Sequence, residues 1–200
     1  QGMNFTGVVY YDGQGFMVPR RLGISRARDL NGATVCLTAG TTAEANLADF
    51  ARANNITFRP VTFKGNDPTR QAYLAGRCDA YATDVSALAS SRAGMALNPE
   101  EHIILPDIVS KEPLSPAVRH GDDQWMDIVR FAVYALIEAE ERGVTQANLD
   151  QMLESTNADV RRLLGVTPGN GRALGLDERW AYNAIKAVGN YGEMFERNIG

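Results

Sequence analysis

The segment from Ala33 to Thr42, which reads ATVCLTAGTT, has the residue types of an anion site at the start of a helix. A buried strand is expected to end at Gly40, and a helix is expected to begin at once. The first N–H groups of a helix lack partners within it, and the helix dipole favours negative charge there. With the hydroxyls of Thr41 and Thr42, these donors would hold a small anion such as a carboxylate, and Gly40 would let it approach the backbone closely. A phosphate fits less well, because no lysine follows as in a P-loop.

A carboxylate ends the second informative segment, which runs from Cys78 to Asp84 and reads CDAYATD. In an α/β sheet we expect this strand to lie beside the first, with both carboxyl ends at the edge where ligands bind. An anion site beside a carboxylate suits a zwitterion, with the α-carboxylate of an amino acid at the helix start and its α-ammonium at Asp84. Structural roles are the alternative: Thr41 and Glu44 could form a capping box, and Asp84 could cap the following helix.

Strand and helix signals alternate over the first two thirds of the chain. Apolar or alternating runs predict strands over residues 5–11, 15–19, 33–39, 56–63, 78–83 and 102–105. Helices are expected between them over residues 42–54, 66–76 and 85–93. This order predicts an α/β fold in which a parallel-rich sheet is flanked by helices.

The chain becomes helical in pattern after about Pro116. Asp122–Arg142 carries apolar residues such as Trp125, Ile128 and Leu136 at helical spacing, with acids at its start and a glycine after its end. Shorter helices are expected to start at residues 145, 157 and 177. A helical segment of this size must pack either on the α/β part or on a segment outside this sequence.

The composition excludes several classes of function. The 200 residues are 44% hydrophobic and 22% charged, with 20 basic and 24 acidic side chains and a net charge of −4. This balance argues against nucleic-acid binding, and no apolar stretch approaches the roughly 20 residues of a membrane-spanning helix. Two histidines and two cysteines give no metal or cofactor motif, so neither is expected. Cys36 and Cys78 lie on strands that are expected to be neighbours. The two cysteines could form a disulfide or remain as two buried thiols.

Longer motifs resemble a known family. Residues 29–44 read DLNGATVCLTAGTTAE, which resembles the D-L-x-G-x-x-V-x-x-x-x-G-T-T-x-E signature of periplasmic amino-acid-binding proteins. Further similar segments are residues 75–84 (AGRCDAYATD), 110–114 (SKEPL), 117–125 (AVRHGDDQW) and 190–198 (NYGEMFERN). Over nearly its whole length, the chain resembles the general L-amino-acid-binding component of ABC uptake systems, in the polar amino acid solute-binding family.

The resemblance implies a type II periplasmic-binding-protein architecture, in which two α/β lobes joined by crossover strands close on a ligand. Residues 1–14 would be the end of the first lobe and a crossover, and residues 15–110 the second α/β lobe. Residues 111–200 would be the return crossover and the helical C-terminal segment of the first lobe.

The resemblance also implies a ligand, a location and partners. Its motif places the α-carboxylate of an L-amino acid on Thr38, Gly40, Thr41 and Thr42, and the α-ammonium on Asp84. The partner would be the ABC permease in the inner membrane. A periplasmic location favours a disulfide between Cys36 and Cys78.

One departure from the family concerns the first lobe. Most of that lobe, including the arginine that clamps the carboxylate, has no counterpart in the sequence, so we expect an N-terminally truncated fragment that binds amino acids weakly or not at all. Its helical tail would expose an apolar face around Trp125, Ile128 and Leu136, and copies are expected to associate through it. The alternatives are a dehydratase-like enzyme on the same fold or a ligand-sensing domain. No further cleft acid or base stands out beyond Asp84, so an enzyme is not expected.

Overall fold

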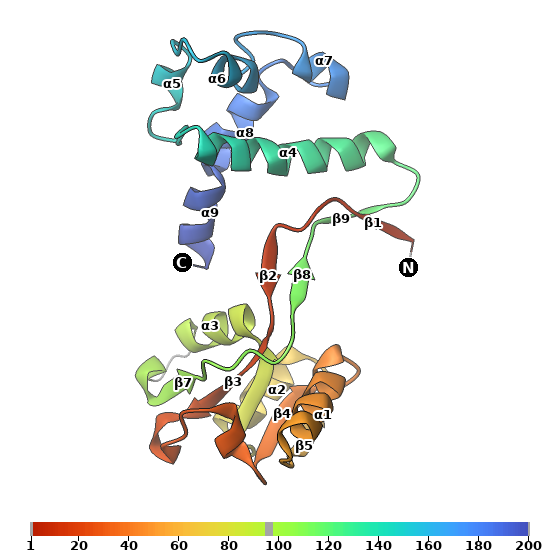
Figure 1. Cartoon of the computed structure of the whole chain (residues 1–200), viewed down its shortest axis with the longest axis vertical. Helices are drawn as coiled ribbons and strands as arrows, with labels where there is room; N and C mark the ends of the chain where they lie inside the picture. The colour runs from red at the N-terminus through yellow and green to blue at the C-terminus, as the bar shows by residue number, and fades with distance from the viewer. Residues whose placement is uncertain (1, 95–97, 200) are drawn as a thin grey trace. The chain divides into compact units, whose positions relative to one another are not determined.

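The computed structural model describes residues 2–94 and 98–199. The chain divides into two compact units, one formed by Gln1–Tyr10 with Leu114–Gly200 and the other by Tyr11–Pro113. The boundaries between them fall within β2 (Tyr10–Asp12) and β8 (Glu112–Leu114), which form a two-stranded sheet (Figure 1).

The unit Tyr11–Pro113 is built on a five-stranded sheet in the order β5-β4-β6-β3-β7. Its strands are β3 (Gln14–Pro19), β4 (Thr34–Thr38), β5 (Arg59–Phe63), β6 (Ala80–Asp84) and β7 (His102–Ile104). β4 pairs in parallel with both β5 and β6, whereas β3 is antiparallel to both β6 and β7. The predicted α/β class is confirmed, and the sheet is mixed because β3 runs against its neighbours.

Three helices follow strands of this sheet (Figure 1). They are α1 (Thr42–Asn54), α2 (Asn66–Leu74) and α3 (Val85–Ala93), and short 3₁₀ turns cover Arg20–Leu22, Ala27–Leu30 and Pro99–Glu101. These helices match the expected positions closely, since their local signals are strong. Asn55, for example, ends α1 in the left-handed conformation with a φ of 53°, which asparagine tolerates well.

Both faces of the sheet are buried, which explains the continuous apolar runs of its strands. Successive strand residues point to opposite faces. One core includes Phe16, Val35, Leu37 and Ala82, with Leu47 of α1. The other face carries Met17, Cys36 and Tyr81, packed with Tyr73 of α2 and Leu88 of α3.

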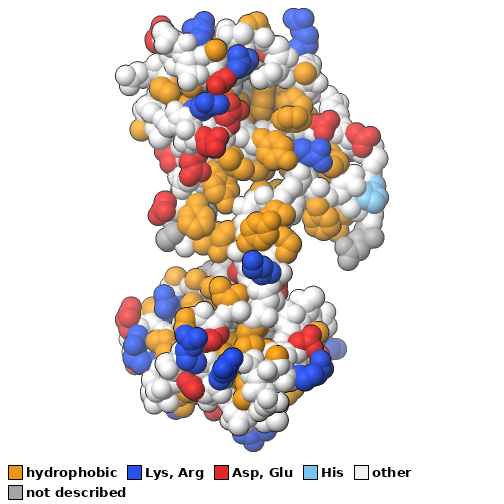
Figure 2. Space-filling view, viewed as in Figure 1, with side chains coloured by type: hydrophobic (Ala, Val, Ile, Leu, Met, Phe, Trp, Pro, Cys, Tyr) orange, Lys and Arg blue, Asp and Glu red, His pale blue; other side chains and the backbone are white. Residues whose placement is uncertain are grey.

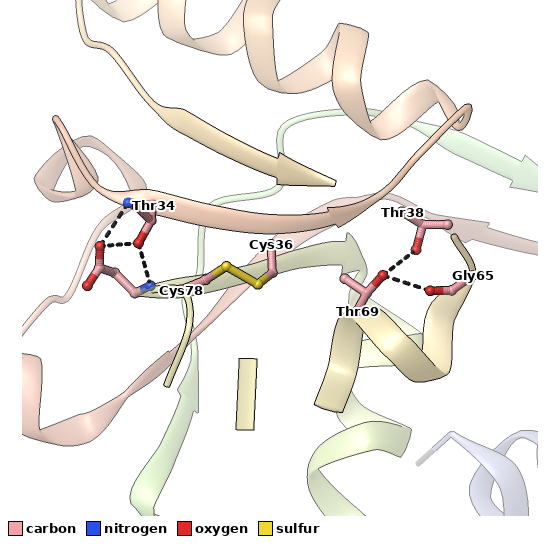
Figure 3. The surroundings of a disulfide bond; sticks show 7 residues. Thr34, Cys36, Thr38, Gly65, Thr69 and Cys78 are labelled. Carbon is pink, nitrogen blue, oxygen red and sulfur yellow. Dashed lines mark hydrogen bonds between the residues drawn. A yellow bond between two sulfur atoms is a disulfide. The ribbon is translucent and has the colours of Figure 1, made fainter. Parts of the chain in front are cut away.

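A disulfide joins β4 to the start of the β6 segment on this second face. The sulfurs of Cys36 and Cys78 are 2.00 Å apart and both residues are buried (Figure 3). Beside it, the carboxylate of Asp79 accepts hydrogen bonds from the N–H and hydroxyl of Thr34 at 2.8 and 2.6 Å. The sequence left open whether Cys36 and Cys78 form a disulfide or are buried thiols, and in the structure they form the disulfide.

The other unit is mostly helical. Its helices are α4 (Asp123–Glu141), α5 (Leu149–Met152), α6 (Ala158–Leu163), α7 (Asn170–Leu174), α8 (Trp180–Val188) and α9 (Tyr191–Asn198). A two-stranded antiparallel sheet pairs β1 (Met3–Phe5) with β9 (Ala117–Arg119). The helical core joins Ala139 of α4, Val160 of α6 and Ile185 of α8. No helix among the described residues is long and apolar enough to span a membrane.

Two local predictions differ from the structure. The strand expected over residues 5–11 is two strands, β1 and β2, because Gly7 has a φ of 151° and Thr6 donates instead to the carbonyl of Pro116 at 3.0 Å. The helix expected to start at Thr145 starts later, at Leu149, since Thr145 and Asn148 bond each other's backbone N–H groups in a turn.

Helix α4 exposes several large apolar side chains. Trp125, Phe131 and Tyr134 are 51%, 44% and 49% exposed, and Figure 2 shows hydrophobic side chains on the surface of this unit. Of the predicted face, Trp125 is open to solvent, whereas Ile128 is half-buried and Leu136 packs against the helical core.

Candidate functional site

A small cavity of about 210 Å³ lies at the carboxyl ends of β4 and β6. These strands are parallel neighbours, so their carboxyl ends meet at one edge of the sheet. The cavity is lined by Thr38, Thr41, Thr42, Ala43, Asn66, Ala82, Thr83, Asp84 and Glu112. Four of the five ligand residues predicted from the sequence therefore line one cavity: Thr38, Thr41, Thr42 and Asp84.

Helix α1 begins at this cavity without a side-chain cap. The Thr41 hydroxyl donates to the carbonyl oxygen of Thr38 at 2.8 Å, and the Glu44 carboxylate accepts from the N–H of Gly40 at 3.1 Å. The capping box considered for Thr41 and Glu44 is therefore absent. The N–H groups of the first turn remain available to an anion, as does the exposed Thr42 side chain.

Gly40 does not line the cavity. Its φ of 73° lies in the left-handed region, and an added Cβ would meet nothing within 4 Å. Glycine is therefore favoured here by the backbone conformation of the strand-to-helix turn rather than by crowding.

Thr38 ties the end of β4 to the start of α2. Its hydroxyl donates to Asn66 Oδ1 at 2.9 Å and lies 3.2 Å from the hydroxyl of Thr69 (Figure 3). The buried Thr69 in turn donates to the carbonyl of Gly65 at 2.7 Å. Thr38 thus holds two walls of the cavity together.

The Asp84 side chain does not cap helix α3. Burial raises the pKa of Asp84 to about 6, with contributions from a hydrogen bond and the charge of Glu112 and from the charge of Asp12. The capping role considered for Asp84 is therefore absent, and its carboxyl group is placed to meet a cation in the cavity.

Two acids at this site were missed by the sequence analysis. Glu112, from β8, accepts from the Ser110 hydroxyl at 2.8 Å and from the Asn46 amide of α1 at 3.4 Å. Asp12, from β2, is buried and accepts from the Gly13 N–H at 2.8 Å and from the Ser86 hydroxyl. A signal for Glu112 was present, because the SKEPL motif contains it. The described residues include no group of three or more His, Cys, Asp or Glu arranged to hold a metal ion.

A larger hollow of about 770 Å³ in the same unit is lined by Tyr73 and His102, among others. The Tyr73 hydroxyl lies 2.6 Å from His102 Nδ1. Burial raises the pKa of Tyr73 and lowers that of His102. A neutral imidazole bonded to a buried phenol fits a structural role.

Comparison with known proteins identifies the family. Residues 5–116 match the protein family described as NMT1/THI5 like. The chain belongs to the NMT1/THI5-like family. This match covers the whole five-stranded sheet and all the cavity residues.

Two curated relatives of this NMT1/THI5-like chain align along its length. It is 56% identical over 201 residues to the General L-amino acid-binding periplasmic protein AapJ of Rhizobium johnstonii. It is 54% identical over 199 residues to the Glutamate/glutamine/aspartate/asparagine-binding protein BztA of Rhodobacter capsulatus. The alignments cover 100% and 99% of this chain and 59% of each relative. The resemblance to periplasmic amino-acid-binding proteins and the periplasmic location are thus confirmed, and the chain spans about three fifths of these relatives' length.

One solved structure agrees in fold and sequence. A periplasmic binding protein of an ABC transporter from Brucella ovis, with glutathione bound, is 51% identical with a TM-score of 0.94. The alignment covers 100% of this chain and 63% of that one. This similarity confirms the periplasmic-binding-protein fold.

Proposed function

We propose that this chain is part of a solute-binding protein that captures L-amino acids in the periplasm for an ABC permease. The observation that carries the proposal is the cavity that joins an uncapped helix start to a carboxylate. The N–H groups of the first turn of α1, with the Thr42 hydroxyl, would bind the α-carboxylate. Asp84 would bind the α-ammonium through charge-assisted hydrogen bonds.

The names of the relatives support this ligand class. AapJ is named for general L-amino acids and BztA for four acidic or amide amino acids, and the Brucella structure holds glutathione. Glutathione carries a free α-ammonium and α-carboxylate on its glutamyl residue, so all these ligands share the group that the cavity would recognise. The relatives are named as binding proteins, which favours binding over a dehydratase-like reaction.

We further propose how the chain is divided in the complete protein. Residues 15–110 would be the second lobe, which carries the cavity residues other than Glu112, with residues 1–14 and 111–200 forming the crossovers and part of the first lobe. Closure of the lobes would complete the enclosure of the ligand, so this chain is expected to bind amino acids weakly.

Nuclear magnetic resonance detects weak binding and tests the proposal on the 200-residue chain. L-Glutamine is expected to give saturable shifts of the amides of Thr41, Thr42 and Ala43. Glutaramate, which lacks the α-ammonium, and 4-aminobutanamide, which lacks the α-carboxylate, are expected to bind at least tenfold more weakly. Equal binding of all three compounds, or no saturable shift at these amides, would contradict the proposal.

A further inference from the structure

Three carboxyl groups from different strands meet beside the cavity. Asp84 ends β6, Glu112 begins β8 and Asp12 ends β2. Asp84 and Glu112 line the same cavity, and a hydrogen bond and the charge of Glu112, together with the charge of Asp12, help to raise the pKa of Asp84. None of the ion pairs found among the described residues includes any of these three acids. The group therefore has negative charge without a cationic partner.

The acids on the helices around Asp84 have partners of their own. In the first turn of α1 the acid is Glu44, which bonds to Gly40. Asp67 at the start of α2 pairs with Arg70 at 3.1 Å. The first turn of α3 has no acid, and its Ser86 donates to Asp12.

The side chain of Gln14 has a hydrogen-bond acceptor without a donor at this end of the sheet. Its Oε1 atom is the buried side-chain oxygen without a hydrogen-bond partner among the described residues, and the residue is 1% exposed. Gln14 lies opposite Asp84 in the β3–β6 ladder, and its amide group donates to the carbonyl of Ala43, a cavity residue, at 3.3 Å. Its backbone N–H donates to Ser110, which donates to Glu112. The residue thus joins both sides of the cavity.

We propose that Glu112 is a second carboxylate of the ligand site, and that Asp84 and Glu112 share one proton that the ligand's α-ammonium replaces. The inference rests on the proposed function, because it assigns a specificity-determining residue to that same site. It also gives a role to Glu112, which lines the cavity from β8 whereas Asp84 lines it from β6.

The exchange balances in protons and charge. Below about pH 6 the two carboxyl groups of the empty site share one proton and carry one negative charge. When the ligand binds, that proton leaves to the buffer, while the ammonium keeps its three protons and donates to both carboxylates. Two carboxylates and one ammonium again carry one negative charge, and no covalent bond changes in the ligand.

The exchange makes ligand affinity depend on pH. Asp84 has a pKa of about 6 in the ligand-free site, and a bound ammonium lowers it. Affinity is therefore full above about pH 7, is about halved at pH 6 and falls further as the pH drops, by up to about tenfold per pH unit. A site with a carboxylate of ordinary pKa would keep its affinity down to about pH 4.

The test compares the 200-residue chain with Glu112→Gln, and with Glu141→Gln as a control on an exposed acid of α4. Carbon-13 spectra follow the Asp84 carboxyl from pH 4 to pH 8 without ligand, and amide shifts give the affinity for L-glutamine over the same range. We expect the parent affinity to fall about fivefold between pH 6 and pH 5, because about half of the sites are already protonated at pH 6. In Glu112→Gln the Asp84 midpoint falls by about one unit, the affinity at pH 7 drops about fivefold, and the loss below pH 6 is smaller.

Each outcome decides between the two proposals. No saturable binding at any pH overturns the proposed function, and this inference with it. Binding of equal affinity at pH 5 and pH 7, or an Asp84 midpoint that Glu112→Gln leaves unchanged, overturns this inference alone. If Glu112→Gln fails to fold, the pH profile of the parent chain still decides.

Discussion

The Thr41 hydroxyl donates a hydrogen bond to the carbonyl oxygen of Thr38, 2.8 Å away, instead of capping helix α1. This bond closes the turn between β4 and α1 around Gly40. It leaves the first N–H groups of α1 without a side-chain acceptor, so a ligand carboxylate can take that place. The two neighbouring threonines should therefore have different roles, Thr41 in the turn and Thr42 toward the ligand.

Valine substitutions separate these two roles. Thr42→Val removes a hydroxyl that lines the cavity, so it should lower the affinity for L-glutamine about tenfold and change stability by less than about 0.5 kcal/mol. Thr41→Val should instead cost about 1 kcal/mol of unfolding free energy. Amide-shift titrations and urea unfolding measure both quantities. Equal losses of affinity and stability in the two variants would refute the division of roles.

Asp84 should destabilise the folded chain at neutral pH. Its folded pKa of about 6 lies above the unfolded value of about 3.9, so stability falls as the pH rises from 4 to 6 and stays low above that. Asp84→Asn should then gain about 1 kcal/mol at pH 7.5, or about 2–4 °C in Tm, after discounting for solvent screening. At pH 4 the gain should vanish. Calorimetry at both pH values checks this.

Asp79 is a control for that measurement, because its pKa is shifted in the opposite direction from that of Asp84. Hydrogen bonds from the Thr34 hydroxyl and N–H hold the pKa of Asp79 below its usual range. Its stabilising effect is therefore present at neutral pH and lost as the pH falls. Asp79→Asn should lose about 1 kcal/mol at pH 7.5. A gain in Asp79→Asn, or a loss in Asp84→Asn, would contradict the assignment.

The local elements around the site and the neighbouring positions of β4 and β6 could be predicted from the sequence, but the pairing of β2 with β8 could not. The buried run before Gly40 and the stop signal at Asn55 act over a few residues, and the structure follows them closely. The neighbouring positions of β4 and β6 follow from the alternation of strands and helices.

Glu112 and Asp12 show where sequence reasoning stops. Glu112 lines the cavity and Asp12 acts on Asp84 through its charge, and both lie there because β2 and β8 pair with each other, although these strands are far apart in the sequence. Residue spacing carries no signal for such a pairing, and the same reason hid the antiparallel direction of β3. These acids were therefore missing from the predicted site, even though their charges help to set the pKa of Asp84.

Reduction of the disulfide should destabilise the chain by about 2–4 kcal/mol. The bond joins cysteines separated by 42 residues, so it restricts a long loop of the unfolded chain. Urea unfolding with and without dithiothreitol measures the effect. A Cys36→Ala, Cys78→Ala double variant should be insensitive to the reductant. An unchanged midpoint for the parent would show that the bond is absent or energetically neutral.

The exposed face of α4 predicts association between copies of the chain. Phe131 and Tyr134 are 44% and 49% exposed there, so their burial would remove apolar surface from water. Sedimentation should show a mass that rises with concentration, and serine at both positions should restore a monomer. Tyr11→Ser, at an exposed position of the other unit, is the matched control. A parent chain that stays monomeric at high concentration would exclude this prediction.

The pairing of Asp84 with the α-ammonium is the central claim, and a cycle of two proteins and two ligands tests it most directly. The parent chain and Asp84→Asn are each titrated at pH 7.5 with L-glutamine and with glutaramate, which lacks the ammonium. Asp84→Asn should bind L-glutamine at least tenfold more weakly and glutaramate no more weakly than the parent does. If the substitution lowers both affinities by the same factor, Asp84 does not bind the ammonium and the account is wrong.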